Sequence, residues 1–298
     1  MKGPDMERIL VATDMTEEGD AALRRAAALA QGLGAELVLL HVMQGGLPDD
    51  LDAMFEKALM ARLEGKAVDL RERRGLDVVA RIGVGTDWMV ILDRIEEEGA
   101  DLLVMGAHRH PGLIDLFRGT TGERVAKACG VPLLVVRGES DAPYRSVLVA
   151  TDFSLAAREA LDTARHLVPE ARTRVLHAFT VPFRQVLRGT ARRDVLDKER
   201  RHARRDAEAG MATFLGGLEN RIDESDRLFV EEEASGAIRH EIDRTPTDLL
   251  ALGTHSRPRL SEALLGSVAR GLMADPPCDI LAVPPSIKVE KPLKGAVR

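Results

Sequence analysis

Residues 8–30 read RILVATDMTEEGDAALRRAAALA, and residues 146–168 repeat the pattern as SVLVATDFSLAAREALDTARHLV. In each copy a short apolar run, typical of a buried strand, leads through Thr-Asp into the apolar spacing of an amphipathic helix. The alignment places Asp14 against Asp152, 138 residues further on. Self-similarity in one register predicts that the chain contains the same structural unit twice.

A second pair of matching stretches lies near the end of each repeat. Residues 101–109 read DLLVMGAHR and residues 248–256 read DLLALGTHS, 147 positions apart. The nine extra residues therefore lie between the two anchors. We expect them in an unusually long second helix of the latter half, at about 185–217. The polar stretch RGESDAPY, residues 137–144, breaks both apolar patterns and is the predicted linker.

Short apolar runs alternate with helical patterns in both halves, which predicts parallel strands joined by helical crossovers. The expected fold class is α/β, with two tandem doubly wound, Rossmann-like domains that each contain a five-stranded parallel sheet. The expected limits are 1–138 and 144–285 for the domains and 286–298 for a C-terminal tail. The predicted helices of the first half are 17–32, 50–74, 87–98 and 120–129. The predicted strands are 9–12, 36–42, 77–82, 102–105 and 133–136, then 147–150, 174–178, 228–230, 249–252 and 280–283.

The overall composition is that of a globular chain long enough for two cores. Of the 298 residues, 45% are hydrophobic and 30% charged, and the net charge is −6, so we expect no nucleic-acid partner. No apolar run approaches the ~20 residues that cross a bilayer, and the N-terminus lacks a signal core. We therefore expect a cytoplasmic protein without a membrane partner. Cys129 and Cys278 are expected to be small buried hydrophobes.

The residues that end or follow the strands define the expected ligand site, because open parallel sheets bind ligands at the carboxyl ends of their strands. Asp14 and Asp152 end the first predicted strand region of each half, and Gly106 and Gly253 end the fourth. A glycine there lets a ligand approach backbone amides, and the positive end of the next helix favours a phosphate group. The alternative interpretation is a tight turn without a ligand for the glycines and helix capping for the aspartates.

These residues carry a resemblance to the universal stress protein family, in its tandem two-domain form. ATP-binding members of that family show Gly-x-x-Gly, nine residues and then Gly-Ser/Thr after the fourth strand. Each half of this chain matches three of the four positions and reads Gly106, Arg109, Gly119 and Thr120 first, then Gly253, Ser256, Gly266 and Ser267. The resemblance implies a cytoplasmic stress-response protein that binds ATP or another adenine nucleotide.

The resemblance also assigns residues to the adenosine end of the ligand. It places Asp14 and Asp152 beside the adenosine moiety, and Val42 and Ala178 at the wall of the adenine pocket. Together with the eight loop residues above, these four complete the expected nucleotide-binding set.

Both halves depart from the family pattern at the second glycine of the loop. Arg109 either blocks the phosphate channel or supplies a cation to the phosphates, whereas Ser256 is small and offers a hydroxyl. A non-glycine residue in a left-handed backbone costs about 1–2 kcal/mol, which weakens a site without abolishing it. We therefore expect nucleotide binding preferentially in the second half.

Two expectations concern contacts with other domains and proteins. The resemblance implies that strands 133–136 and 280–283 pair with each other, so that the chain mimics a dimer of single domains, and a homodimer of the whole chain is also expected. From Arg188 to Arg205, eight basic residues outnumber three acidic ones. This stretch is either a solvated helix, with the acidic run 231–233 as an internal counterpart, or a docking surface for an acidic protein partner.

Catalytic motifs are lacking. The sequence contains no Gly-x-Ser-x-Gly elbow and no P-loop lysine, so we expect a binding protein with at most slow ATP hydrolysis rather than a hydrolase or metal-dependent enzyme. His41, His108, His177 and His255 fall at matched positions, and hydrogen-bonded structural roles are favoured over a metal site. The alternative function is a nucleotide-free interaction module with degenerate loops that acts through protein partners.

Overall fold

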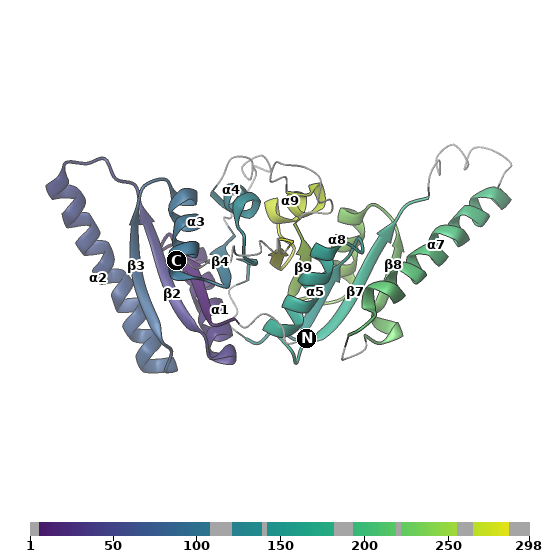
Figure 1. The fold of residues 1–298 in the computed structure, drawn as a ribbon, viewed down its shortest axis with the longest axis horizontal. Coiled ribbons are helices and arrows are strands. Elements are labelled where there is room, and N and C mark those ends of the chain that lie inside the picture. Colours follow the sequence, from purple (N-terminus) through teal and green to yellow (C-terminus); the bar gives the residue numbers. More distant parts are fainter. Residues whose placement is uncertain are drawn as a thin grey trace, which may run out of the picture.

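The computed structural model describes residues 6–107, 121–138, 142–181, 193–218, 222–254 and 265–285. One sheet contains ten strands in the order β3-β2-β1-β4-β5-β10-β9-β6-β7-β8 (Figure 1). The strands of the first half are β1 (Arg8–Ala12), β2 (Glu36–Met43), β3 (Val78–Val84), β4 (Leu102–Gly106) and β5 (Leu133–Val136). Those of the second half are β6 (Ser146–Ala150), β7 (Arg172–Phe179), β8 (Arg227–Glu231), β9 (Leu249–Gly253) and β10 (Asp279–Val283).

Each half is a doubly wound sheet of five parallel strands. The first strand of the half lies in the middle, between the second and the fourth, and every neighbouring pair within a half runs parallel. The ten predicted strands are all present, with ends that differ from the prediction by at most two residues. The expected fold class is therefore confirmed.

Helices cover both faces of the sheet (Figure 1). One face packs against α1 (Glu17–Leu33), α2 (Asp49–Arg74), α5 (Leu155–Leu167) and α7 (Arg193–Leu215). The other packs against α3 (Asp87–Glu98), α4 (Thr121–Ala128), α8 (Ala234–Arg244) and α9 (Ser267–Ala274). Burial on both faces explains why residues 37–40 of β2 form an unbroken apolar run, all without exposed surface.

In the described part of the chain, the second helix of the latter half is not longer than that of the first half. α2 has 26 residues, whereas the described α7 has 23. Residues 44–77 join β2 to β3, while residues 180–226 join β7 to β8 and include the 3-10 helix η2 (Glu224–Asp226). The expectation of an unusually long helix is wrong for the described part, and its predicted start at 185–192 lies outside the described residues.

The two halves join through β5 and β10, which pair antiparallel with Leu281 opposite Leu134. The predicted pairing of the two last strands within one chain is thus confirmed. The continuous ten-stranded sheet leaves β3 and β8 as its outer strands.

Asp279, the first residue of β10, fixes the linker between the halves. Its Oδ1 accepts hydrogen bonds from the backbone N–H groups of Arg137 and Gly138 at 2.8 and 2.9 Å, and its Oδ2 accepts one from the Tyr144 hydroxyl at 2.6 Å. Burial raises the pKa of Tyr144 well above its usual value, so the hydroxyl keeps the proton that it donates. Arg25 of α1 lies 3.5 Å from Oδ2. The polar linker is therefore anchored to both halves.

A second contact across the halves joins α4 to α9. Glu123 and Arg270 stand at equivalent positions of the two repeats, and Arg270 Nε lies 3.8 Å from Glu123 Oε1. Lys127 of α4 adds an ion pair with the same carboxylate at 2.8 Å. Two identical halves would place like charges against each other here, so the Glu-Arg combination suits two halves that differ in sequence.

Candidate functional site

A hydrogen-bonded turn follows β1 at the carboxyl edge of the first half. Asp14 Oδ1 accepts hydrogen bonds from the Thr16 backbone N–H at 3.0 Å and from the Thr16 hydroxyl at 2.6 Å. Thr16 is the N-cap of α1, and its Oγ1 accepts from the Gly19 N–H at 3.3 Å. The exposed carboxylate of Asp14 is thereby held at the mouth of a crevice.

The second half repeats this turn after β6. Asp152 Oδ1 accepts a hydrogen bond from the Ser154 N–H at 3.0 Å, and Ser154, the N-cap of α5, accepts from the Ala157 N–H at 3.2 Å. The aspartates therefore position the N-cap residue, and the alternative in which they cap the helix themselves is wrong. A carboxylate two residues before the N-cap lies too far back to reach the first free N–H groups of the helix.

The histidines after the second strands hold these turns in place. His41 Nδ1 lies 2.8 Å from the Thr13 carbonyl oxygen, and His177 Nδ1 lies 2.9 Å from that of Thr151. Met15 and Phe153 lie two residues after these threonines and have left-handed φ angles of 63° and 64°. The histidines thus have the expected structural role, and they stabilise a turn that carries backbone strain. His108 and His255 lie outside the described residues.

Gly106 and Gly253 are required by packing between helix and strand. A Cβ at Gly106 would lie 2.6 Å from the carbonyl oxygen of Glu18, and a Cβ at Gly253 would lie 2.7 Å from the carbonyl carbon of Ala156. The absence of a side chain lets α1 and α5 approach the fourth strand of each half. The predicted role in ligand approach stays a prediction, since the packing alone explains both glycines.

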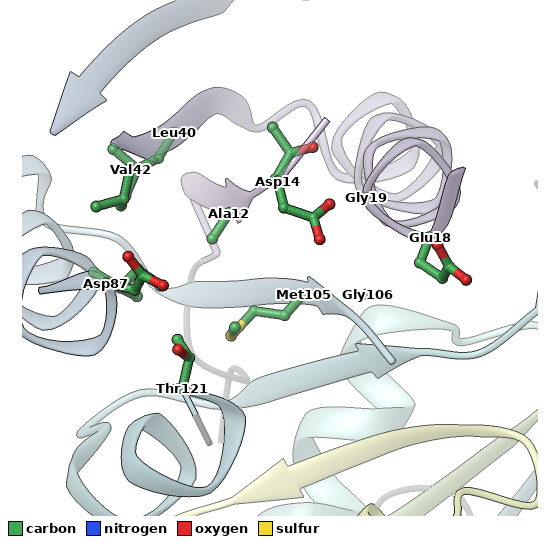
Figure 2. A pocket seen from close by; sticks show the side chains of 12 residues that line it. Ala12, Asp14, Glu18, Gly19, Leu40, Val42, Asp87, Met105, Gly106 and Thr121 are labelled. Atoms are coloured by element: carbon green, nitrogen blue, oxygen red, sulfur yellow. The ribbon is translucent and has the colours of Figure 1, made fainter. Parts of the chain in front are cut away.

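The first crevice is a cavity of about 90 Å³ between the ends of β1, β2 and β4 and the first turns of α1, α3 and α4. Asp14, Glu18 and Asp87 are the acidic residues of its lining. Figure 2 shows Asp14 and Asp87 on opposite sides of the space beside Met105. The apolar part of the lining consists of Ala12, Leu40, Val42, Ile91 and Met105.

The second crevice is a cavity of about 180 Å³ at the equivalent place, between β6, β7 and β9 and the first turns of α5, α8 and α9. Asp152 is the one carboxylate among its described lining residues. Gly266, the N-cap of α9, donates its N–H to the Thr254 carbonyl at 2.8 Å, and Ser267 follows it at the open end of the helix. The apolar lining includes Leu176, Ala178, Ala234, Ile238 and Leu252.

Aligning the two crevices by the repeat shows where they differ. Val42 of the first corresponds to Ala178 of the second. Glu18 corresponds to Ala156, and Asp87 corresponds to Ala234. The second crevice therefore lacks two carboxylates and has a smaller wall residue, which accounts for its larger cavity.

Glu18 and Asp87 were not among the predicted site residues. Glu18 stands in the first repeated stretch where the second copy has Ala156, and Asp87 lies outside the repeated stretches. The signal was present as two positions where the repeat exchanges a carboxylate for alanine. Of the predicted site residues, the structure brings Asp14, Val42 and Gly106 together in the first crevice. It brings Asp152, Ala178, Gly253, Gly266 and Ser267 together in the second. Arg109, Gly119, Thr120 and Ser256 lie outside the described residues.

The predicted basic stretch has an internal partner. Arg200 Nε lies 2.5 Å from Glu231 Oε2, and this hydrogen bond raises the pKa of Arg200 above its usual value. Arg204 pairs with Glu208 and stacks over Phe229 at 4.4 Å from the ring centroid. In the part of α7 that is described, the structure thus supports the solvated helix with an acidic counterpart; Arg188 lies outside the described residues.

Both cysteines are free thiols. Burial raises the pKa of Cys129 to about 11, and burial together with the charge of Asp279 raises that of Cys278 to about 12. No cluster of three or more His, Cys, Asp or Glu suited to a metal ion occurs within the described ranges. The helices of the described part include none that is long and apolar enough to cross a membrane.

Fold and sites together define a tandem α/β protein with two related crevices at the carboxyl ends of its strands. The model of the universal stress protein family matches residues 6–137 and again residues 143–284. The chain therefore belongs to the universal stress protein family.

Comparisons with single proteins agree. Universal stress protein MJ0577 of Methanocaldococcus jannaschii is 28% identical over 154 residues, which cover 44% of this chain and 94% of that protein. A universal stress protein of Thermus aquaticus is 34% identical over 134 residues, covering 43% of this chain and 97% of its own length. The crystal structure of a universal stress protein from Archaeoglobus fulgidus has a TM-score of 0.67 at 17% identity, with 94% of this chain and 98% of that chain covered. The likeness of fold extends over both halves.

Proposed function

We propose that this universal stress protein binds ATP or another adenine nucleotide in the crevice of its second half. One observation carries the proposal: that crevice combines a single described carboxylate, Asp152, with the amino end of α9 at Gly266 and Ser267. The first N–H groups of a helix have no partner within the helix and favour an anion. The family pattern of ATP-binding members, which ends in Gly-Ser at this position, supports a phosphate group there.

The adenosine end of the ligand would occupy the apolar part of the same cavity. Ala178 and Ile238 provide apolar surface for the adenine ring, and Asp152 offers a carboxylate to hydrogen-bond donors of the adenosine moiety. Gly253 lets α5 pack close to β9 beside the cavity. Ser256, which lies outside the described residues, would contribute its hydroxyl to the phosphate loop. These roles explain why the cavity has both a polar and an apolar end.

The first crevice is proposed to bind nucleotide more weakly. Its equivalent residues, Asp14, Val42 and Gly106 with Arg109, Gly119 and Thr120, belong to the same pattern. Glu18 and Asp87, however, add two negative charges to a smaller cavity. Like charges within a few ångström repel by about 1 kcal/mol or more, and a polyphosphate would meet both carboxylates.

In this proposed role, the protein binds a ligand as part of a cytoplasmic stress response. Among the described lining residues, neither crevice holds a lysine that could clamp a transferring phosphate. At most slow ATP hydrolysis is therefore proposed. Occupancy would act by biasing the segments between β4 and α4 and between β9 and α9, which join the two ends of each crevice.

The experiment begins with freshly purified protein, which is denatured and searched for released adenine nucleotide by mass spectrometry. Thermal unfolding is then followed with and without millimolar ATP, because a ligand that binds the folded state raises the melting temperature. We expect released nucleotide or an ATP-dependent rise that Asp152→Ala diminishes. Asp14→Ala is the matched control and should leave the rise intact.

Absence of released nucleotide together with an unchanged melting temperature would contradict the proposal. That outcome would favour the alternative, a nucleotide-free interaction module that acts through protein partners. Equal losses in Asp14→Ala and Asp152→Ala would keep nucleotide binding but overturn the preference for the second half.

A further inference from the structure

An open groove of about 420 Å³ lies beside the first crevice. Apart from two glycines, its described lining consists of polar and aromatic side chains: Gln44, Thr86, Asp87, Trp88, Thr121 and Arg124. They come from the segments that follow β2 and β3 and from the first turns of α3 and α4. Asp87 and Thr121 also line the first crevice, and Figure 2 shows both on the side of that crevice away from Glu18. We call this space the Trp88 groove.

Backbone contacts fix one wall of the Trp88 groove. The N–H of Gly85 donates to the carbonyl oxygen of Met43 at 3.0 Å, which joins the segment after β3 to the end of β2. Gly45 lies so close to β3 that a Cβ on it would be 2.8 Å from Val84 Cγ1. Gly45 and Gly85 are the two glycines of the lining. The shape of this wall is therefore set by the fold and not by the side chains of the groove.

Arg124 and Asp87 bring one positive and one negative charge to the groove. The Arg124 guanidinium lies over the Trp88 ring, 5.7 Å from the ring centroid, and forms no ion pair or hydrogen bond with any other described residue. The Asp87 carboxylate, in the first turn of α3, likewise has no hydrogen-bond or ion-pair partner in the described ranges. An anion would be repelled by Asp87 and a cation by Arg124. A ligand with one charge of each sign would satisfy both.

The neutral polar groups of the groove also have free hydrogen-bonding capacity. Thr86 precedes α3 without capping it through its side chain, and the Thr121 hydroxyl and the Gln44 amide have no partner within the described chain. The Nε1–H of Trp88 is buried and has no acceptor. Buried indole N–H groups usually have one. Several donors and acceptors around one groove, beside an aromatic ring, suit a small polar ligand.

The second half does not repeat the charged and aromatic groups of the Trp88 groove. The positions 147 residues after Asp87, Trp88 and Arg124 carry small side chains: Ala234, Ser235 and Gly271. The helices α8 and α9 form without these groups. The fold therefore does not require a Trp-Arg pair and a carboxylate here, and their presence in the first half needs another reason.

We propose that the Trp88 groove binds a zwitterionic α-amino acid with an apolar side chain, its carboxylate at Arg124 and its ammonium group at Asp87. A guanidinium can donate two parallel hydrogen bonds to a carboxylate. The three N–H groups of the ammonium suit the Asp87 carboxylate and the neighbouring hydroxyl and amide oxygens. The half-buried indole of Trp88 offers apolar surface to the side chain of the ligand. This site is distinct from the nucleotide crevice of the second half and does not depend on it.

The test uses tryptophan fluorescence, because Trp88 is the only tryptophan of the chain and its emission reports on the groove alone. The full chain is titrated with L-leucine and with two analogues that each lack one charge. These are 4-methylpentanoate, without the ammonium group, and 3-methylbutylamine, without the carboxylate. We expect a saturable change in emission with L-leucine and at least about tenfold weaker binding of either analogue, since each loses a hydrogen-bonded charge.

Variants then assign each charge of the ligand to its residue. Arg124→Gln and Asp87→Asn should each weaken L-leucine binding at least about tenfold. Arg124→Gln should also bind L-leucine and 3-methylbutylamine about equally, because the carboxylate has lost its partner. The matched controls are Arg62→Gln and Asp93→Asn, at exposed side chains outside the groove, and both should leave the affinity unchanged.

Three results would overturn the proposal. One is an emission that does not respond to millimolar L-leucine. Another is equal binding of L-leucine and of an analogue that lacks one charge. The third is an emission that responds to ATP but not to L-leucine, which would make the groove part of the nucleotide site of the first crevice. None of these results would decide whether the second half binds nucleotide.

Discussion

The two crevices share a turn and differ in the charge of their walls. Asp14 and Asp152 make the same hydrogen bond to the N-cap residue of the next helix, at the same distance of 3.0 Å. Around that common turn, Glu18 and Asp87 of the first crevice are replaced by alanine in the second. The repeated aspartates hold the turn in both halves, whereas other residues that line the crevices have diverged.

The two halves also differ at other places in the molecule. Where Glu123 stands in the first half, Arg270 stands in the second, and the two meet across the junction. At the amino end of α2, Leu51, Met54 and Phe55 are exposed, whereas Leu196 near the amino end of α7 is buried. The halves therefore differ both at the contact between them and in their crevices.

The largest effect is expected at the glycine that the two crevices share, Gly106 in the first and Gly253 in the second. Gly106→Val and Gly253→Val should each lower the free energy of unfolding by about 1–3 kcal/mol, because the new Cβ would collide with the backbone of α1 or α5. Urea denaturation of the two variants measures this. A loss in one half alone would break the structural equivalence of the repeats.

Introducing the carboxylate of the first crevice into the second should have the next largest effect. Ala234→Asp gives the second crevice the carboxylate that Asp87 provides in the first, and it should lower ATP affinity about tenfold through repulsion of the phosphates. Isothermal titration calorimetry measures the loss, which should shrink at high salt. The matched control, Asp87→Ala, should leave binding to the second half unchanged. A salt-independent loss would point to a steric cause instead.

Removal of the shared aspartate should cost somewhat less. Asp152→Ala deletes one hydrogen bond to the ligand, worth about 1 kcal/mol, so ATP affinity should fall roughly fivefold. The N-cap Ser154 remains, and the melting temperature without ligand should change little. If Asp152→Ala lowered only the melting temperature and not the affinity, the residue would serve the turn alone.

The smallest effect concerns the wall of the cavity. Ala178→Val introduces the side chain that the first crevice has at Val42, and it should lower ATP affinity about twofold to threefold by narrowing the space for the adenine ring. Competition with a fluorescent ATP analogue is sensitive enough to show it. An increase in affinity would mean that the adenine ring lies elsewhere.

The fold followed from the sequence almost completely. Runs such as residues 37–40 and 102–104, which are buried on both faces, are unbroken in apolar character, and the Thr-Asp turns lie between a strand and a helix in both copies. Local patterns of this kind depend on near neighbours in the sequence. These patterns can therefore be recognised in the sequence without the structure.

The parts that escaped prediction depend on residues far apart in the chain. Asp87 lines the first crevice because α3 begins beside β2 and β4, and no motif marks that position. The packing role of Gly106 depends on the approach of Glu18, 88 positions earlier. Such contacts are determined by tertiary packing, which the apolar periodicity of the sequence does not reveal.

We propose that the chain binds one adenine nucleotide, in its second half. The stoichiometry of ATP binding to the full chain, measured by isothermal titration calorimetry and repeated with Ala234→Asp and with Asp14→Ala, tests this. We expect about one high-affinity site per chain, weakened by Ala234→Asp and unchanged by Asp14→Ala. Two equal sites per chain, or a single site that Asp14→Ala removes, would contradict it.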